Sequence, residues 1–464
     1  MDRTPCKKLW ILIVLLAELT PSAAAWALPV APAEPFSFTR ALHSRAFPFD
    51  GDRPISAGQD YNGDGVLELA IGQSTFSYAE VAILDGVTGS ILRQFRGRDD
   101  ADSNFIESLA IVPDMNGDGF RDVIVGDPLV GRGRVYNFST IGSGPIEEVG
   151  RLIYEIEGPG PTAGFGNDVA VFDDKAAIAW SDRGRVRIVD LATGAAVAQL
   201  SGRSTSGFGF SVTPIGDVNN DGAEDWLASD PNVFPGGSGR GEAYVLSGLT
   251  TTPTDSWTPI DSLPAGSLLA TLRNEGAANV FMGVSRNSPF ANLGDPSPGN
   301  GQIEQFLVSG GADGFLAHKL TLLPGGNLSV EQVAFADPQT SEFGQLRHLE
   351  GLSDVNFDGV GDFALLDDLI NAVVIISGRD LLDGYQPFDI LQRMVPAAGE
   401  QFSALTSLGD YDANGSVDLA IGMRVAGTIR YDVYSAAVPE PSSTVLAAVA
   451  LVAIIVVSRS VHSA

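Results

Sequence analysis

The stretch DYNGDGVLELAIG, residues 60–72, joins an acidic, glycine-centred loop to an apolar run. Close variants of this stretch recur along the chain: DMNGDGFRDVIVG from Asp114, DVNNDGAEDWLAS from Asp217, DVNFDGVGDFALL from Asp354 and DYDANGSVDLAIG from Asp410. Five copies of one pattern indicate a repeat architecture, because each copy takes the same place in a repeated structural unit. The position of the loop before a strand-like run makes the unit a β unit.

The intervals between the acidic loops set the length of the unit. Asp60 and Asp114 lie 54 residues apart, and Asp354 and Asp410 lie 56 apart. The two intervals around Asp217, of 103 and 137 residues, are about twice as long. Each long interval therefore predicts one unit without an acidic loop, near residues 163–200 and near residues 278–318. The repeat count becomes seven.

The rest of each unit consists of short apolar runs closed by turn residues. VAILDG, EAYVLSG and AVVIISG are examples, and no amphipathic helix separates them. Fifty-four glycines and 27 prolines in 464 residues agree with many turns and short strands. About four strands per unit, repeated seven times, predict an all-β fold, a seven-bladed β-propeller.

Several further marks carry a resemblance to a known family. Phe-Gly lead-ins occur in GFGFSV from Gly207 and in EFGQL from Glu342, and the strands VIVGDP and WLASDP follow two of the loops. With the acidic loops, these marks resemble the FG-GAP repeat of integrin α-subunits and of many bacterial surface proteins, over residues 50–435. The resemblance implies a seven-bladed propeller whose loops join the first and second strands of a blade and hold Ca²⁺.

The loops carry oxygen side chains at positions 1, 3, 5 and 9, and a glycine at position 6. A cation of the size and hardness of Ca²⁺ takes six to eight oxygen ligands, and a tight loop presents alternate side chains inward. Position 7 offers its backbone carbonyl. The predicted ligands are Asp60, Asn62, Asp64, Glu68, Asp114, Asn116, Asp118, Asp122, Asp217, Asn219, Asp221, Asp225, Asp354, Asn356, Asp358, Asp362, Asp410, Asp412, Asn414 and Asp418.

Two other interpretations of the loops are weaker. An EF-hand needs an acidic ligand at position 12, where this chain has Ile71, Val125, Ala228, Leu365 and Ile421. Plain Asx-rich turns would not match at every ligand position in five copies. We therefore predict about five structural Ca²⁺ ions. Three carboxylates in each loop repel one another without the cation, so Ca²⁺ is expected to contribute to folding.

Both ends of the chain resemble targeting segments. Residues 1–27, with basic residues, the run LWILIVLLA and the stretch PSAAAWA, have the layout of a secretory signal peptide. Residues 436–464 resemble a PEP-CTERM sorting tail with Pro439, Glu440 and Pro441, which implies cleavage by an exosortase-type enzyme. A plain C-terminal membrane anchor is the alternative. Residues 28–49 form an N-terminal segment that could close the ring. We expect an exported protein of a bacterial cell envelope, outer surface or extracellular matrix.

Charge and composition narrow the function further. A net charge of −29 disfavours nucleic-acid binding, because it would repel phosphates. The single cysteine, Cys6, lies within the predicted signal peptide, so disulfide and thiol chemistry are not expected in the mature chain. The four histidines show no metal-ligand spacing, and no nucleophile elbow is present. We predict a non-enzymatic binding or adhesion protein for an extracellular protein or polysaccharide.

Two alternatives to this function stay open at the level of sequence. A lectin-like propeller would use exposed aromatic residues in repeated positions, which are sparse. A quinoprotein-type dehydrogenase relies on repeated tryptophans, and only Trp180, Trp226 and Trp257 lie in the repeat array.

Overall fold

The computed structural model describes most of the repeat array. The described residues are 38–47, 55–57, 60–74, 79–96, 106–128, 134–138, 152–159, 164–203, 207–233, 241–274, 290–297, 302–311, 314–324, 327–336, 346–383, 390–411, 417–425 and 428–436. They lie in one compact unit, Phe36–Val438. The predicted signal peptide and the Pro-Glu-Pro motif lie outside the described residues.

Strands dominate the described part of the chain, and they form seven sheets there. The first three sheets, each in sequence order, consist of β2 (Ile55–Ala57), β3 (Leu69–Ser74), β4 (Ala79–Leu84) and β5 (Ile91–Arg96); β6 (Ser108–Val112), β7 (Asp122–Asp127), β8 (Arg134–Phe138) and β9 (Leu152–Glu157); and β10 (Phe165–Phe172), β11 (Lys175–Trp180), β12 (Arg185–Asp190) and β13 (Ala196–Ser201).

The next three sheets follow the same order, and the last sheet ends with the first strand of the chain. They consist of β14 (Val212–Gly216), β15 (Asp225–Asp230), β16 (Glu242–Leu246) and β18 (Leu268–Arg273); β19 (Phe290–Asn292), β20 (Glu304–Gly311), β21 (Gly314–Leu322) and β22 (Leu328–Ala336); β23 (Leu346–Gly351), β24 (Phe363–Asp367), β25 (Ala372–Ile376) and β26 (Ile390–Met394); and β27 (Glu400–Gly409), β28 (Asp418–Val425), β29 (Thr428–Ala436) and β1 (Phe38–Phe47). These neighbouring strands pair antiparallel throughout.

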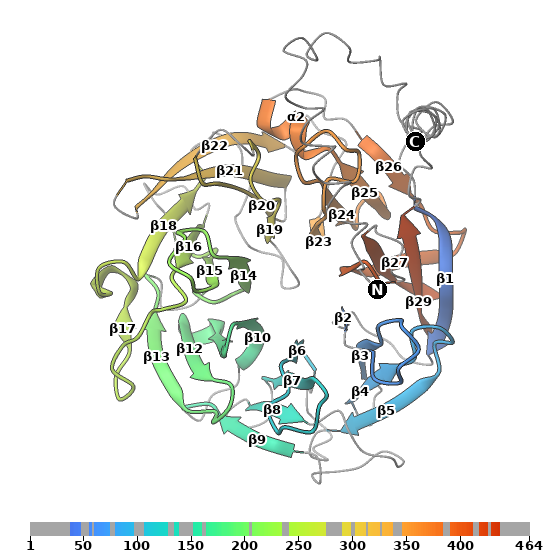
Figure 1. Ribbon diagram of the computed structural model, residues 1–464, viewed down its shortest axis with the longest axis horizontal. Helices are drawn as coiled ribbons and strands as arrows, with labels where there is room; N and C mark the ends of the chain where they lie inside the picture. The colour runs from blue at the N-terminus through green and yellow to red at the C-terminus, as the bar shows by residue number, and fades with distance from the viewer. Residues whose placement is uncertain are drawn as a thin grey trace, which may run out of the picture. The chain divides into compact units, whose positions relative to one another are not determined.

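The sheets follow one another around a ring (Figure 1). The first strands β2, β6, β10, β14, β19, β23 and β27 contact one another in succession, and β27 contacts β2. Strand β1 lies at the outer edge of the last sheet, where it pairs with β29, so the start of the array completes the sheet made by its end. The predicted all-β propeller is confirmed.

The strands are apolar on both faces because each sheet is packed between two others. In the first sheet, Leu69 and Ile71 lie in a core cluster with residues of the last sheet. Ala70, between them in sequence, lies in a cluster with Val123 and Val125 of the second sheet. Successive residues of a strand point to opposite faces, so a strand covered on both sides needs a continuous apolar run. This explains why apolar runs, and not alternating patterns, follow the acidic loops.

The third sheet differs from the four-strand pattern that the sequence predicts. A short strand β17 (Thr258–Pro259), from the connection between β16 and β18, pairs parallel with β13 as a fifth strand. Trp257 precedes this strand, and the guanidinium of Arg185 lies 4.6 Å from the centre of its ring. The third and fourth sheets are thereby linked at their outer edges.

The third and fifth sheets correspond to the units for which no acidic loop is expected. Strands β10 and β11 are joined by two residues, Asp173 and Asp174. In the fifth sheet β19 starts at Phe290, and the stretch 278–285, assigned to this unit from the sequence, lies outside the described residues. The described helices are short, and none of them is long and apolar enough to cross a membrane.

Candidate metal-binding loops

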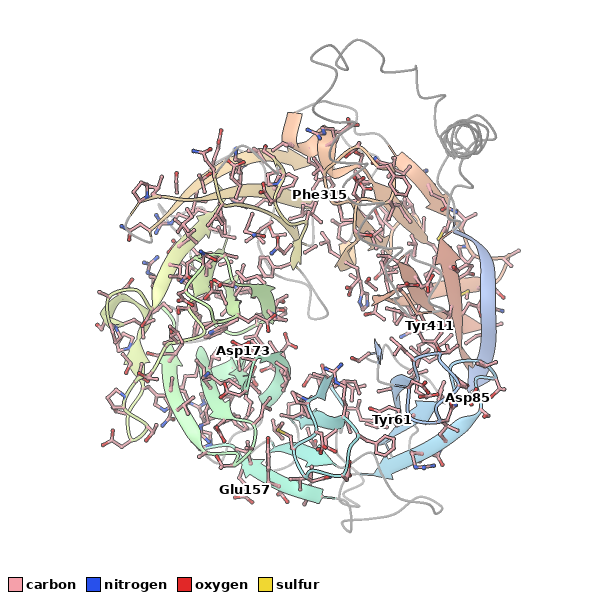
Figure 2. The ribbon with its side chains drawn as sticks, viewed as in Figure 1. Tyr61, Asp85, Glu157, Asp173, Phe315 and Tyr411 are labelled. Carbon is pink, nitrogen blue, oxygen red and sulfur yellow. The ribbon has the colours of Figure 1, made fainter. Side chains whose placement is uncertain are left out.

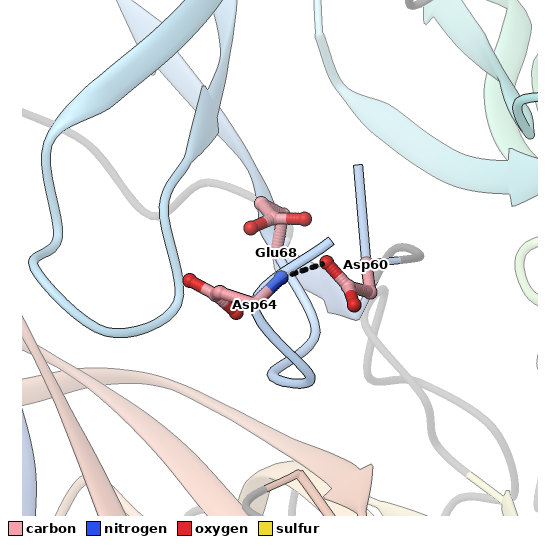
Figure 3. A group of neighbouring side chains, drawn as sticks. All are labelled: Asp60, Asp64 and Glu68. Carbon is pink, nitrogen blue, oxygen red and sulfur yellow. Dashed lines mark hydrogen bonds between the residues drawn. The ribbon is translucent and has the colours of Figure 1, made fainter. Parts of the chain in front are cut away.

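The acidic loops occupy the same place in each sheet that carries one. Each connects the first strand to the second, so that position 9 stands at or just before the start of the second strand. Strand neighbours alternate in direction, and all these connections therefore lie on one side of the ring. Figure 3 shows the first loop, with Asp60, Asp64 and Glu68 grouped around its turn.

The first carboxylate of the loop organises the backbone. Asp60 accepts hydrogen bonds from the backbone N–H groups of Gly63 at 2.6 Å, Asp64 at 3.1 Å and Gly65 at 2.8 Å. The Gly65 N–H has the largest effect and, with its neighbours, lowers the pKa of Asp60 below its usual value. The chain reverses at Gly65, where φ is +90°, a conformation that glycine adopts at little cost.

Three other loops repeat this geometry closely. The position-6 glycine donates its N–H to the position-1 aspartate at 2.7–2.9 Å in the pairs Gly119–Asp114, Gly222–Asp217 and Gly359–Asp354. Their φ values are +91°, +90° and +91°. The same residue types at the same spacing thus give one loop conformation four times.

The last carboxylate of each loop is buried beneath it. Glu68, Asp122, Asp225, Asp362 and Asp418 are all 0% exposed. Each accepts the backbone N–H of the residue at position 2, and the four aspartates do so at 2.7–2.9 Å. Burial is the main cause that raises the pKa of Glu68, Asp225 and Asp362 to about 7. The surroundings of these three carboxyl groups therefore do not offset the cost of burying a negative charge.

The first loop fits a hard cation on an observation independent of the sequence pattern. Oxygens of Asp60, Asp64 and Glu68 lie within 4.8 Å of one another. Oε1 of Glu68 is buried and has no hydrogen-bond partner. A buried charged oxygen left without a donor is costly, and a divalent cation is a partner that these three side chains can share.

Among the described residues, three carboxylates come within 4.8 Å of one another only in the first loop. In the other loops, hydrogen bonds link some members of the predicted ligand sets. The Asn at position 3 donates to the Asp at position 5 in the pairs Asn62–Asp64, Asn219–Asp221 and Asn356–Asp358, at 2.8–3.0 Å. In the second loop the corresponding Asn116 amide approaches Asp122 at 3.4 Å. In the fifth loop Asp410 and Asp418 are described, whereas Asp412 and Asn414 lie outside the described residues.

The structure adds residues that the sequence analysis did not assign to the loops. They lie in the turn after the third strand: Asp85 accepts a hydrogen bond from Asn62 at 2.9 Å, Ser247 donates to Asp221 at 3.2 Å and Ser377 donates to Asp358 at 2.9 Å. The signal was present in the phrases LDG, LSG and ISG, where the polar residue precedes a glycine. Those phrases were interpreted only as hairpin turns.

Neighbouring loops also contact one another through position 2. The hydroxyl of Tyr61 donates to the backbone carbonyl of Arg121 in the second loop at 3.1 Å, and its ring stacks on Phe120 at 6.0 Å. Tyr411 of the fifth loop lies in the core cluster shared by the first and last sheets. Figure 2 labels Tyr61 at the first sheet and Tyr411 at the last sheet.

Two of the four histidines, His318 and His348, lie in buried positions within the sheets. His318 of β21 is buried, and its Nε2 lies 3.0 Å from the backbone carbonyl of Arg273. His348 of β23 is buried as well.

Comparisons with known proteins agree with this architecture. Residues 105–138, which include the second acidic loop, match the FG-GAP repeat family. Human integrin alpha-IIb is 29% identical over 220 residues, 45% of this chain and 17% of that protein. Mouse integrin alpha-IIb is 30% identical over 225 residues, 47% of this chain and 18% of that protein. The matched region thus spans less than a fifth of these relatives.

Among solved structures, the β-propeller domain of Cps50 (Swd1) from Myceliophteria thermophila is similar at a TM-score of 0.48 and 11% identity, covering 84% of this chain and 99% of that chain. The ring of sheets is that of a β-propeller. The repeat match and the integrin alpha-IIb matches show that this propeller is similar to those built from FG-GAP repeats in integrin α-subunits.

Proposed function

We propose that this chain is an exported, Ca²⁺-stabilised seven-bladed propeller that binds an extracellular protein or polysaccharide in a cell-surface or matrix adhesion role. The observation that supports the calcium part is the repeated loop geometry, with a buried position-9 carboxylate in each loop and an unsatisfied oxygen on Glu68. Similarity to integrin alpha-IIb supports the binding part.

In this proposal, each ion is held by the side chains at positions 1, 3, 5 and 9 and by the carbonyl at position 7. Bound Ca²⁺ supplies positive charge among three carboxylates, which removes their mutual repulsion. The chain's own residues set the shape of the loop: the backbone reverses at the position-6 glycine, and the position-1 carboxylate accepts hydrogen bonds from backbone N–H groups. The ion's role is structural, because the ligands belong to connections between strands of single blades.

The proposed organisation assigns residues 1–27 to a signal peptide, 28–49 to a segment with the closing strand β1, 50–435 to the propeller and 436–464 to a sorting tail. Pairing of β1 with β29 supports the closing role. Export to a calcium-rich exterior suits a protein with several calcium loops. Detection of the mature N-terminus and of the C-terminal cut by mass spectrometry tests these boundaries.

Thermal unfolding of the purified protein with CaCl₂ or with a chelator tests the calcium proposal. We expect a lower melting temperature in chelator and recovery on adding Ca²⁺. An unchanged melt would contradict it. Binding is tested separately, with a glycan array and with immobilised matrix proteins. Turnover of a polysaccharide or of a quinone-linked alcohol would overturn the non-enzymatic role.

A further inference from the structure

The turn after β4 brings an additional carboxylate to the first loop. Oδ2 of Asp85 accepts a hydrogen bond from the side-chain amide of Asn62 at 2.9 Å. The same amide donates to Asp64 at 3.0 Å, so it is held between two carboxylates. Oδ1 of Asp85 closes its own turn, with Thr88 N at 2.6 Å and Thr88 Oγ1 at 2.7 Å. One side chain therefore serves both the turn and the loop.

The equivalent place in two other blades is neutral. Ser247 and Ser377 stand there beside the third and fourth loops. In the fourth loop the surroundings are also more positive, because Arg379 donates to the backbone carbonyl of Asp358 at 2.7 Å. The first loop thus has four carboxylates, whereas the fourth loop has three and an arginine.

The third sheet shows that the turn itself does not explain the contact. Asp190, at the end of β12, closes the same kind of turn, with Thr193 N at 2.9 Å and Thr193 Oγ1 at 2.6 Å. This sheet has only the two-residue connection Asp173–Asp174 where the first sheet has its acidic loop. An aspartate at this place can therefore close the turn without contacting an acidic loop. The hydrogen bond between Asp85 and Asn62 is a separate feature of the first blade.

A second, independent observation in the same cluster points to a cation as the missing partner. Glu68, the glutamate at position 9, is 0% exposed, and its Oε1 has no hydrogen-bond partner. Carboxylate oxygens of Glu68, Asp60 and Asp64 lie within 4.8 Å of one another. The other four loops have an aspartate at position 9. The first loop therefore differs from the third and fourth loops both in its buried glutamate at position 9 and in the additional carboxylate of Asp85.

We propose that Asp85 is a positioning residue that strengthens cation binding by the first loop and makes it the tightest calcium site among the first, third and fourth loops. It acts through Asn62, whose amide it orients, and through its negative charge. The inference rests on the proposed calcium function of the loops. The fold itself does not require it, since serine occupies the same place elsewhere.

Calcium titration by isothermal calorimetry tests this inference on the full-length mature protein. Asp85→Asn keeps an oxygen for Thr88 but removes the charge and the acceptor facing Asn62. We expect the tightest binding class to weaken about tenfold, the effect of one unit charge at this range on a divalent ion in a wet surface site. Asp190→Asn is the matched control, and it should leave the titration unchanged.

Two further variants separate positioning from general destabilisation. Glu68→Gln should remove the tightest class, and Asp85→Asn added to it should then have no further effect on the remaining classes. Ser377→Asp should tighten binding at the fourth loop several-fold, a gain that damage to the fold cannot produce. Near-UV circular dichroism in saturating CaCl₂ checks that every variant is folded.

The outcomes are distinguishable from failure of the calcium function. Absence of calcium binding by the unmodified protein would overturn both. Normal binding that Asp85→Asn leaves unchanged, or that Asp190→Asn weakens equally, would overturn only the role of Asp85.

Discussion

The first and third sheets differ in how the turn after their third strand packs against the connection between their first two strands. In the first sheet, Gly86 follows Asp85, and a Cβ at Gly86 would lie 2.1 Å from the backbone carbonyl of Leu67 in the acidic loop. In the third sheet, Leu191 follows Asp190, is fully buried, and donates its N–H to the carbonyl of Asp174 at 2.9 Å. A short hairpin leaves room for a leucine, whereas the acidic loop fills that space with backbone.

The difference changes what holds each sheet together. The third sheet gains apolar contacts and direct backbone hydrogen bonds, and its Asp173 exchanges hydrogen bonds with Glu224 of the neighbouring loop at 2.8 and 3.2 Å. The first sheet has carboxylates in the same place, and these are stabilising only when their charge is neutralised. Blades with acidic loops should therefore depend on calcium, whereas the third blade should not.

Removing calcium is expected to have the largest effect. Each occupied site contributes about 2.7 kcal/mol to the free energy of unfolding when Ca²⁺ is at 100 times its dissociation constant, so several sites together outweigh any single substitution. Hydrogen exchange with and without chelator measures the effect blade by blade. Protection should fall in β3 and β24 and change least in β11. Equal loss in all three strands would contradict the contrast between blades.

A pair of substitutions tests the two packing solutions. Leu191→Ala should lower the free energy of unfolding by about 2–5 kcal/mol, because it leaves a cavity in a buried cluster, without changing calcium affinity. Gly86→Ala should cost about 1–3 kcal/mol by overpacking, and it should also weaken calcium binding because Leu67 lies in the loop. Denaturant unfolding and calcium titration give both quantities. An unchanged calcium affinity in Gly86→Ala would contradict the proposed contact between this turn and the acidic loop.

The pH dependence should differ between the metal-free and calcium-loaded protein. Without calcium, Glu68, Asp225 and Asp362 have their pKa raised to about 7, from 3.8–4.5 for ordinary carboxyls. The folded state then binds more protons than the unfolded state. These three carboxyls therefore contribute their full stabilisation of the metal-free fold below about pH 4, and this stabilisation is lost as the pH rises toward 7. Calcium requires the ionised forms, so its stabilisation should grow over the same range. Melting curves in chelator and in CaCl₂ measure both trends, and parallel curves would argue against them.

The smallest effect concerns the contact between neighbouring loops. Tyr61→Phe removes the hydrogen bond to Arg121 O but keeps the ring against Phe120, and it should cost about 0.5–1.5 kcal/mol. Denaturant unfolding in saturating calcium measures this loss. Tyr154→Phe, which removes a hydroxyl from β9, is the matched control. Affinity of the first loop should change more for Tyr61→Phe than for Tyr154→Phe.

Much of the architecture could be predicted because it depends on interactions between residues that are close together in the sequence. The nine-residue loop spacing gave the position of four turns, since Asp60 and Gly65 determine the backbone path within a few residues of each other. The intervals predicted two further units, where the third and fifth sheets lie, and the apolar runs predicted strands. That these strands are covered on both faces is seen only in the folded ring. The fifth strand β17 was missed, because two residues, Thr258 and Pro259, carry no strand signal and pair only with a neighbouring sheet.

The sequence by itself determined the repeat, the loop conformation and the side chains that each loop presents, because these depend on residues close together in the chain. Tertiary structure alone decided which side chains from distant segments complete each loop: Asp85 reaches Asn62 across 23 residues, and Tyr61 reaches Arg121 across 60. Such contacts depend on strand register and on the packing of sheet against sheet. A local pattern contains neither, and for that reason the aspartate and the two serines of the third-strand turns were recognised only in the folded ring.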